Sequence, residues 1–560
     1  MKKIFYSILM VFAATALTSC LEEAFPEGST VTEKQLGEVA SGLESAVLGI
    51  PARMQQGYLV YGEQEHETDM AYPQFMIALT EMLGDMYPLG SNSGYDWYRN
   101  YNTCDRIYGS TSYFSYLPYR TLYMFVKDAN SIVSAIDTTA ASTTDEMKYY
   151  AGVGRASRAF DYYMLTVLFE PKENVYTDIS SVRGLTVPIV TEATTLEEAQ
   201  DNPRVPHKEM MEFILKDLDE AEQLMAPYTE YCIDKTIAFN RTVPTLATVY
   251  GLKAKVYLWD EKFDKAAEYA RKAINQVTTE MAVERITAGP VTEAQMDDVN
   301  SGFNTANQAW MWYIHYDAEN MGNLCNFTGW MSGECDWGYA SLTCPGIDKS
   351  LYDRMNRSDI RKRMFLNPLK YDYYDYKTCR SADFIENAPA YLSLKFRCLG
   401  GDWETYSEGG AVDVPVMRIE EMLLIEAEAV GASQGVGAGV TLLNNFMKRY
   451  RDSNYNYTAT DLRSFQLEVL TQMRIEFWGE GNAFPSAKRL APDVIQNYEG
   501  TNAPSDIFKV NCKGIKPWWN LVIPDSEEST NAAIQGNNNP DPTKTVIAPT
   551  AIGTFAPANN

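Results

Sequence analysis

Two stretches of the sequence alternate aromatic side chains with side chains that form hydrogen bonds. The first is Tyr95-Asp96-Trp97-Tyr98-Arg99-Asn100-Tyr101, which follows a turn rich in glycine and serine at residues 90–94. The second lies between residues 329 and 340 and contains Trp330, Asp336, Trp337 and Tyr339. Flat rings with a polar edge suit ligands that have one apolar and one polar side, such as sugar rings. Because both stretches look like loops, they predict a ligand-binding surface.

In this interpretation the rings provide contact area, and Asp85, Asp96 and Asn100 orient the ligand by hydrogen bonds. The predicted ligand-binding residues are therefore Asp85, Tyr95, Asp96, Trp97, Tyr98, Asn100, Trp330, Asp336, Trp337 and Tyr339. The alternative is that the rings only close the ends of a helical stack, and Asp85 only caps a turn. Trp310 and Trp312 alternate as in a strand, which favours a place in the core.

None of the segments that resemble enzyme motifs predicts a catalytic residue. Gly431-Ala432-Ser433-Gln434-Gly435 fits G-x-S-x-G, but it follows a helical pattern and no histidine lies downstream to complete a hydrolase. We interpret it as a glycine turn that ends a helix. The glycines at residues 435–439 lack the strand and the spacing of a dinucleotide loop. A pair of carboxylates for glycoside hydrolysis has no local sequence signal, because its separation is set in three dimensions.

The 560 residues carry 74 Asp and Glu against 48 Lys and Arg, a net charge of −26. A phosphate backbone would be repelled, so nucleic-acid binding is excluded. Eight cysteines follow Cys20, and their even number in an exported protein permits disulfides. None forms a Cys-x-x-Cys pair, and only three histidines are present, so we expect no structural zinc. No cofactor is expected.

The N-terminus has the pattern of an export signal. Lys2 and Lys3 precede the apolar run Ile4 to Leu17, which is too short for a membrane-spanning helix. Leu17-Thr18-Ser19-Cys20 resembles the bacterial lipobox, which predicts a signal peptide at residues 1–19 and a lipid on Cys20. Glu22 and Glu23 resemble the acidic tag of surface lipoproteins in Bacteroidetes. We therefore expect attachment to the membrane by lipid alone.

Helical periodicity dominates the remaining chain. Between Ala247 and Ile274, small and apolar residues recur at helical spacing on both sides of a break at residues 259–262, a pattern that resembles a tetratricopeptide helix pair. An ordinary helix hairpin would have almost the same pattern. Further helices are expected at Tyr123–Ile136, Tyr149–Phe169, Lys208–Met225, Val416–Ala432, Gly439–Tyr450 and Leu462–Trp478.

Two segments lack this periodicity. Asn304 to Asp402 is rich in Tyr, Trp, Cys, Gly and Asn and contains the strand-like run Ala309 to Ile314. We predict an irregular, loop-rich excursion there. The tail from Ser526 to Asn560 is rich in Asn, Pro, Thr and Ala, which predicts loose packing.

Taken in order, several segments resemble the SusD/RagB family of lipid-anchored nutrient-binding proteins. They are Tyr123-x-x-Val126-x-x-Ala129-Asn130, Arg155-Ala156-x-Arg158-Ala159-Phe160, Leu168-Phe169, Val187-Pro188-Ile189-Val190, Arg204-Val205-Pro206, Asp217-Leu218-x-x-Ala221, Met417-Arg418-Ile419-x-Glu421-Met422-x-Leu424-Ile425-x-Ala427-Glu428-Ala429, Arg474-x-Glu476-Phe477-x-x-Glu480-Gly481 and Ile523-Pro524-x-x-Glu527. Asp85 matches an aspartate that is frequent in the family's first loop. The chain departs from the family at Gln472-Met473, where a Glu-Arg pair is usual, and at Pro485-Ser486, where an aromatic residue and Asp are usual. We expect apolar packing of Met473 to replace the lost charge pairing.

The resemblance implies a mainly α fold, with a tetratricopeptide-like helix-pair scaffold and short strands in the irregular excursion, forming one domain over residues 20–560. It implies a cell-surface lipoprotein of the outer membrane that binds an oligosaccharide or polysaccharide and hands it to a SusC-like TonB-dependent transporter. An oligopeptide-binding, RagB-like receptor is the first alternative. A helix-repeat adaptor that binds only proteins is the second, and a glycoside hydrolase with measurable turnover is the third.

Overall fold

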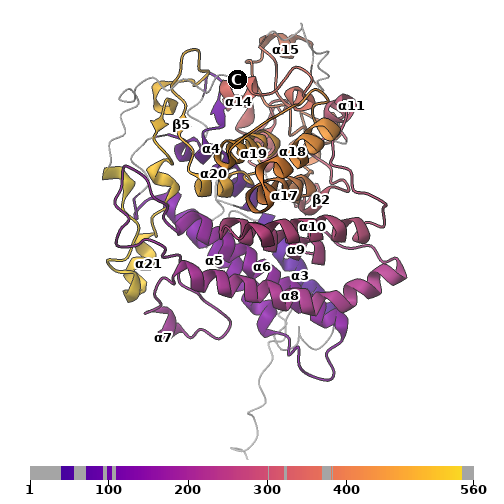
Figure 1. Cartoon of the computed structure of the whole chain (residues 1–560), viewed down its shortest axis with the longest axis vertical. Coiled ribbons are helices and arrows are strands. Elements are labelled where there is room, and N and C mark those ends of the chain that lie inside the picture. The colour runs from indigo at the N-terminus through magenta and orange to yellow at the C-terminus, as the bar shows by residue number, and fades with distance from the viewer. Residues whose placement is uncertain are drawn as a thin grey trace, which may run out of the picture.

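The computed structural model describes residues 40–55, 71–92, 98–103, 109–300, 302–320, 324–368, 380 and 382–544. The predicted signal peptide, Cys20, Glu22 and Glu23 lie outside these residues. The described chain is mainly helical, as predicted (Figure 1). Its long helices are α3 (Ala40–Gln55), α4 (Tyr72–Leu83), α5 (Tyr113–Ser134), α6 (Asp145–Phe169), α8 (His207–Lys235), α9 (Leu246–Trp259), α10 (Phe263–Glu280), α17 (Ile419–Gln434), α18 (Val436–Tyr450) and α19 (Leu462–Glu476).

These helices pack against one another in series. α5 packs on α6, α6 on α8, α8 on α9, α9 on α10, α10 on α17 and α17 on α18, and Figure 1 shows them as neighbouring layers. Glycine permits close approach, because a Cβ on Gly154 of α6 would lie 2.8 Å from Ile132 of α5. Stacking of successive helix pairs is the architecture of a tetratricopeptide-like scaffold.

The predicted helix pair at residues 247–274 is confirmed as α9 and α10. Ala247, Ala254, Ala266 and Ala270 are all completely buried, as the spacing of small residues predicted. A short turn at residues 260–262 joins the two helices. Small side chains at the contact between α9 and α10 allow the two backbones to approach closely. The pair also packs against its neighbours, α9 on α8 and α10 on α17.

The strands form two-stranded antiparallel pairs. β1 (Met86–Pro88) pairs with β3 (Pro345–Ile347), β2 (Trp310–His315) with β4 (Asp413–Arg418), and β5 (Val494–Ile495) with β6 (Asn511–Cys512). Trp310 and Trp312 on β2 are at most 1% exposed, which confirms their predicted place in the core. The predicted helix start at Val416 is wrong, because residues 416–418 belong to β4 and α17 begins at Ile419.

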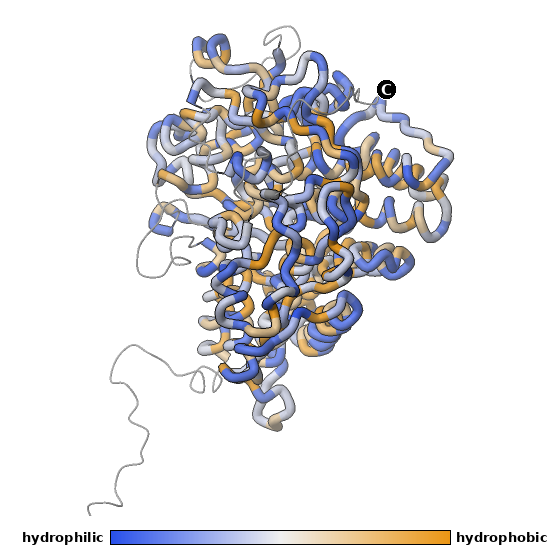
Figure 2. The backbone as a smooth tube through the Cα atoms, turned by 90° about the vertical axis from the view of Figure 1, so that its left-hand side faces the viewer, coloured by the Kyte–Doolittle hydropathy of each residue, from blue (hydrophilic) through white to orange (hydrophobic). Residues whose placement is uncertain are grey.

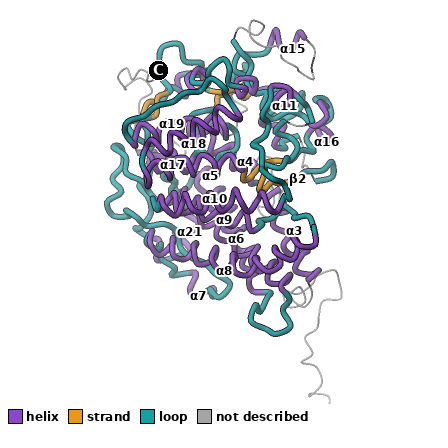
Figure 3. The backbone as a smooth tube through the Cα atoms, turned by 45° about the vertical axis from the view of Figure 1, so that its right-hand side comes forward, coloured by secondary structure: helices purple, strands orange, loops and turns teal. Residues whose placement is uncertain are grey.

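The predicted loop-rich excursion is present. Between β2 and β4 the described residues form short helices, 3₁₀ turns, loops and the short strand β3. Figure 3 shows α15 (Ala382–Asn387) and α16 (Tyr406–Gly409) of this region, and α11 (Glu293–Asp297) from just before β2, among loops on one side of the long helices. The other short helices of this region are α12 (Phe327–Met331), α13 (Ala340–Thr343), α14 (Lys349–Asp353) and the 3₁₀ helix η4 (Ile360–Met364). Loops of this kind carry function more often than scaffold helices do.

One continuous cluster of buried hydrophobic side chains extends from Val47 to Ile534. Hydrophobic positions recur along the whole tube in Figure 2. The prediction of a loosely packed tail is wrong for residues 526–544, because Asn531 and Asn539 are buried and hydrogen-bonded there. α20 (Phe484–Leu490) and α21 (Asp525–Thr530) complete this part of the chain. None of the helices in the described residues has the length and apolar character needed to cross a bilayer.

Candidate functional site

The structure brings the two predicted aromatic stretches together. β1, in the early loop, pairs with β3, which follows the middle loop. The ring of Tyr98, in the 3₁₀ helix η3 (Tyr98–Tyr101), meets Trp330 of α12 edge-on, with 5.0 Å between ring centroids. Trp330 in turn stacks on Tyr339 at 4.4 Å and an interplanar angle of 18°. Residues more than two hundred positions apart therefore form one aromatic cluster.

Most of this cluster is buried. Tyr98 is 0%, Trp330 4% and Trp337 5% exposed. Trp337 packs against Cys335 and Cys398, and the missing side chain of Gly409 makes room for its indole, since a Cβ there would lie 2.7 Å from Cη2. A covered ring presents little area to a ligand, so ligand contact by these rings stays a prediction.

The other predicted residues differ in exposure. The side chain of Asp336 is 58% exposed and lies 4.0 Å from Nη2 of Arg380. Tyr339 and Asn100 are half-buried. Tyr95, Asp96 and Trp97 lie outside the described residues. Among the predicted polar residues that the structure describes, Asp336 thus faces solvent most openly.

One aromatic residue that the sequence analysis missed, Trp403, lies beside Asp336, and a second, Tyr406, follows three residues later in the chain. The backbone N–H of Asp336 donates to the carbonyl of Trp403 at 2.9 Å, and the guanidinium of Arg380 lies over the Trp403 ring, 4.3 Å from its centroid. Trp403 is partly exposed, and Tyr406 at the start of α16 is 40% exposed. We call Asp336, Arg380, Trp403 and Tyr406 the Trp403 surface.

The sequence contains a repeated pattern that could have identified Trp403. The Asp-Trp pair occurs at Asp96-Trp97, at Asp336-Trp337 and again at Asp402-Trp403. Asp402 accepts hydrogen bonds from the backbone N–H groups of Glu404 and Thr405, at 3.2 and 2.9 Å. This turn holds the loop in which Trp403 lies.

Cys335 lies in the same region and is a free thiol. The buried thiol of Cys335 donates to the carbonyl of Trp337 at 3.2 Å. Burial raises the pKa of this thiol to about 12. Cys232, Cys335 and Cys344 are free thiols, so for these three the permitted pairing does not occur.

Asp85 lies in a buried ion pair. Its side chain is 1% exposed, and its two oxygens accept from Nε of Arg474 at 3.1 and 3.0 Å. Its backbone carbonyl also accepts from the indole N–H of Trp478 at 2.9 Å. Both oxygens of the carboxylate are therefore engaged within the protein, where they join the first loop to α19.

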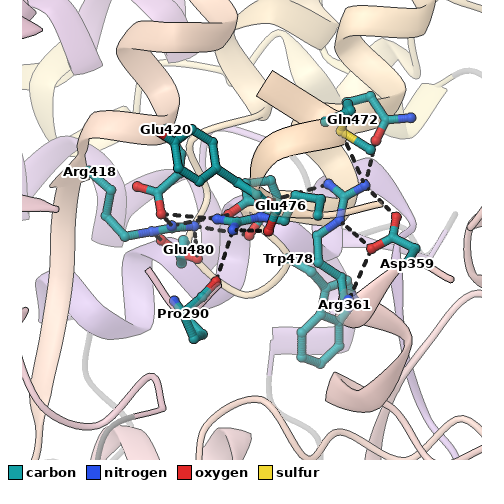
Figure 4. Close-up of polar contacts among 12 residues, drawn as sticks. Pro290, Asp359, Arg361, Arg418, Glu420, Gln472, Glu476, Trp478 and Glu480 are labelled. Carbon is teal, nitrogen blue, oxygen red and sulfur yellow. Dashed lines mark hydrogen bonds and ion pairs between the residues drawn. The ribbon is translucent and has the colours of Figure 1, made fainter. Parts of the chain in front are cut away.

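The two glutamates of the C-terminal motif, Glu476 and Glu480, lie in a buried charge network (Figure 4). Arg451 donates to both oxygens of Glu476 at 2.7 Å. Arg418 donates to Glu480 at 2.7 and 2.9 Å, and Lys395 donates to it at 2.5 Å. Burial alone would raise the pKa of Glu476, but Arg451, Arg418 and Arg361 hold it well below its usual range. These carboxylates are at most 2% exposed and serve the scaffold.

The G-x-S-x-G sequence is part of the helical scaffold. The hydroxyl of Ser433 donates to the carbonyl of Ala429 at 2.7 Å, one turn earlier in α17. Gly435, with φ of 115°, separates α17 from α18. The predicted glycine turn at the helix end is confirmed, and Ser433 has the contacts of a helix residue.

Comparison with known proteins identifies the family. A family model described as "Starch-binding associating with outer membrane" matches residues 62–258, and a SusD family model matches residues 327–542. The chain belongs to the SusD/RagB family. A SusD-like protein of Formosa agariphila is 25% identical over 343 residues, which is 59% of this chain and 61% of that relative.

Solved structures share the SusD-like fold. A SusD-like carbohydrate-binding protein from Bacteroides vulgatus has a TM-score of 0.66 at 19% identity, with 90% of this chain and 98% of that chain covered. Surface glycan-binding protein A from Bacteroides thetaiotaomicron, solved with laminarihexaose, has a TM-score of 0.56 at 15% identity, with coverages of 89% and 99%.

The departure from the SusD/RagB pattern at Gln472-Met473 has a structural substitute. Oε1 of Gln472 accepts from Arg361 at 2.6 Å, and its amide donates to Glu468 at 2.7 Å. Gln472 therefore keeps a polar link although it carries no charge. Met473 is 1% exposed, which confirms that it packs in the core.

Proposed function

We propose that this SusD/RagB protein is a cell-surface lipoprotein that binds an oligomeric glycan and delivers it to a TonB-dependent transporter. Family membership supports a role at the outer membrane. A solved neighbour with the same fold is a glycan-binding protein in complex with laminarihexaose, which supports the ligand class. The lipobox-like sequence ending at Cys20 supports the anchor. Binding of this kind needs no cofactor and no catalytic group.

The observation that carries the glycan assignment is the Trp403 surface. It combines a partly exposed indole, an exposed tyrosine, an exposed carboxylate and a guanidinium within one set of loops. Rings of this kind cover the apolar face of a sugar, while charged side chains bind its hydroxyl groups. Trp403 packs against the small buried cluster that contains Trp337 and Cys335.

The test is affinity electrophoresis and calorimetry of residues 21–560 against a panel of neutral polysaccharides. Trp403→Ala and Tyr406→Ala should each weaken binding about ten-fold, the effect of losing ~1.4 kcal/mol of contact energy. Trp97→Ala tests the first predicted aromatic stretch in the same way. Tyr231→Ala, which removes a 50% exposed ring on α8, is the matched control and should leave binding unchanged.

Different outcomes separate the alternatives. Retarded migration without release of shorter products supports a non-catalytic glycan receptor. Binding of oligopeptides with no glycan response would replace the proposal by the RagB-like alternative. Binding to the transporter alone, with no nutrient affinity, would favour the adaptor, and turnover of a glycan would favour a hydrolase.

A further inference from the structure

A partly enclosed hollow lies beside Arg474, where α14, α19, α20 and β5 surround the end of α4. These elements lie together in the upper part of Figure 1. The hollow has a volume of about 160 Å³, which is more than a single water molecule needs and less than the ~300–1,000 Å³ of sites for drug-sized ligands. We call it the Gln496 hollow, and its lining includes Asp348, Thr471, Arg474, Gln496 and Trp519. It shares no residue with the Trp403 surface.

The wall of the Gln496 hollow contains a buried acceptor that has no donor. Gln496 is 2% exposed, and its Oε1 accepts no hydrogen bond from any residue that the structure describes. Its amide nitrogen donates to the hydroxyl of Tyr87 at 3.2 Å and to Oδ1 of Asn102 at 2.7 Å, and neither partner lines the hollow. Because the nitrogen edge of the amide faces these partners, the oxygen edge faces the hollow. A buried acceptor of this kind costs free energy unless a ligand or a water molecule donates to it.

The orientation of this amide is fixed by its neighbours. Nδ2 of Asn102 donates to the carbonyl of Met86 at 2.9 Å, and Oδ1 of Asn102 accepts from Nζ of Lys516 at 3.0 Å. Because this oxygen can only accept, the atom of Gln496 that meets it must be the amide nitrogen. Gly84, with φ of 82°, leaves room for the amide, since a Cβ there would lie 2.6 Å from the amide carbon of Gln496. The acceptor is therefore in place before any ligand binds, which lowers the entropy cost of binding.

The charged side chains of the lining are already compensated within the protein. Two carboxylates and two guanidinium groups line the hollow. Three of the four form ion pairs, which are Arg474 with Asp85, Arg354 with Glu468 and Asp493 with Lys513. The fourth, Asp348, accepts from two backbone N–H groups at the start of α14, at 2.8 and 3.2 Å. A charged ligand would lose its hydration here without gaining a new counter-charge, so the lining favours a neutral ligand.

The rest of the lining offers an apolar wall and an open donor. Leu83, Leu351 and Trp519 are buried and supply apolar contacts. The indole N–H of Trp519 donates to the carbonyl of Met82 at 2.7 Å, which fixes the position of the ring. Arg474 uses Nε and Nη2 to bind Asp85, and its Nη1 has no hydrogen bond to the residues that the structure describes. The lining thus combines apolar contact with one unused acceptor and one unused donor.

We infer that the Gln496 hollow binds one small neutral molecule with several hydroxyl groups, of the size of a single sugar ring. One hydroxyl group of this ligand donates to Oε1 of Gln496, another accepts from Arg474, and its carbon face packs against Trp519. Water alone would satisfy Gln496 but would leave the apolar wall in contact with water. The inference does not depend on the Trp403 surface, because the two sites share no residue.

The test is fluorine NMR of residues 21–560 labelled with fluorotryptophan and titrated with glucose, galactose, mannose and N-acetylglucosamine. The signal of Trp519, assigned by its loss in Trp519→Phe, should shift in a saturable way with at least one of these sugars. Gln496→Met removes the buried acceptor and should raise the Kd about ten-fold, the effect of one lost hydrogen bond. Thr471→Leu places a larger side chain in the hollow and should abolish the shift.

The matched control is Gln466→Met. Gln466 is also buried, its amide donates to Glu428 at 3.0 Å, and it does not line the hollow. The control removes a comparable buried amide and should leave the Kd unchanged. Thr471→Leu leaves the hydrogen bonds of Gln496 in place, so a folding defect in Gln496→Met would not remove the test.

Three outcomes would overturn the inference. They are no shift of the Trp519 signal with any of the four sugars at about 50 mM, an unchanged shift in Thr471→Leu, and equal loss of affinity in Gln496→Met and Gln466→Met. A crystal structure grown with the sugar that shows only ordered water in the hollow would overturn it as well. The Trp403 signal reports the Trp403 surface separately, so a sugar that shifts the Trp519 signal alone supports this site whatever the result of the glycan panel.

Discussion

At the residue scale, the side chains that carry the family resemblance form their hydrogen bonds within the protein. Arg158 donates to both oxygens of Asp217, at 2.7 and 2.8 Å, and to Asn130 at 2.9 Å. Arg204 donates to the carbonyls of Thr186, Phe169 and Leu185. Because these groups are engaged internally, the motifs report the scaffold and say little about the ligand.

Glu476 provides a residue-scale prediction. It is 1% exposed and accepts from Arg451 and Arg361. Glu476→Gln keeps its shape but leaves buried arginines without their shared anion, so the free energy of unfolding should fall by about 3–5 kcal/mol. Urea denaturation measures this change in the free energy of unfolding.

The control for this prediction is Lys265→Met, which breaks the exposed pair with Glu268. Surface pairs contribute little to stability, so this variant should unfold like the wild type. A fall in unfolding free energy below about 1 kcal/mol for Glu476→Gln would contradict the structural role of the network.

At the element scale, helices are held by close backbone approach and by polar links at their ends. α17 and α18 meet at Gly431 and Gly439, where a Cβ on Gly439 would lie 2.6 Å from the carbonyl oxygen of Ala427. Three elements meet at His207, which begins α8. Its two ring nitrogens bond Glu170, after the end of α6, at 2.9 Å and Asp260, between α9 and α10, at 3.0 Å.

Gly439→Ala should lower the free energy of unfolding by about 1–3 kcal/mol, because the new methyl group would meet backbone atoms that have no room to move. Gly437→Ala, two residues earlier in α18, is the control. A Cβ there meets nothing within 4 Å, so it should be neutral or stabilise the helix by up to about 1 kcal/mol. Equal effects of the two substitutions would contradict the close approach of α17 and α18.

His207 predicts a pH dependence of stability. Hydrogen bonds that the ring donates to Asp260 and Glu170 raise the pKa of His207 from its ordinary 6.5 to about 9. The protonated ring therefore stabilises the fold fully below pH 6.5, and this contribution is lost as the pH rises through 9. The ring is 27% exposed, so we expect a loss of only ~1 kcal/mol. Thermal unfolding between pH 6 and about 9.5 measures it.

The dependence of stability on pH between 6 and about 9.5 should disappear in His207→Gln and persist in His315→Gln, where the exposed histidine pairs with Asp413.

Glu170 makes stability depend on pH in the acidic range. Burial opposes ionisation of Glu170, but bonds from His207 and Lys172 lower its pKa to about 2. Its contribution is present above pH 4.5 and is lost as the pH falls towards 2.

At the scale of the whole molecule, distant segments close the same core. Asn539, near the end of the described chain, donates to the carbonyl of Phe169 at 2.8 Å and to that of Leu521 at 2.7 Å. It also accepts from Arg204 at 3.0 Å. Because the first and last parts of the chain share one hydrophobic cluster, we propose that residues 71–544 unfold as one unit.

Asn539→Ala tests this proposal. It leaves the buried carbonyl of Leu521 without its donor and removes one of the two donors to the carbonyl of Phe169, so the free energy of unfolding should fall by about 1–3 kcal/mol. Far-ultraviolet circular dichroism and tryptophan fluorescence should report the same shifted transition. Asn537→Ala, an exposed asparagine two residues earlier, should cause almost no change. Two separate transitions would show that the halves are independent.

The sequence by itself determined the mainly helical scaffold, the α9–α10 pair, the buried Trp310 and Trp312 and the family, because periodicity and motif order are local properties of the chain. Only the tertiary structure decided which aromatic rings meet solvent. Trp337 is covered because Gly409 leaves room for its indole, while Trp403 stays partly exposed beside Asp336. Exposure depends on neighbours distant in sequence, which local spacing does not report.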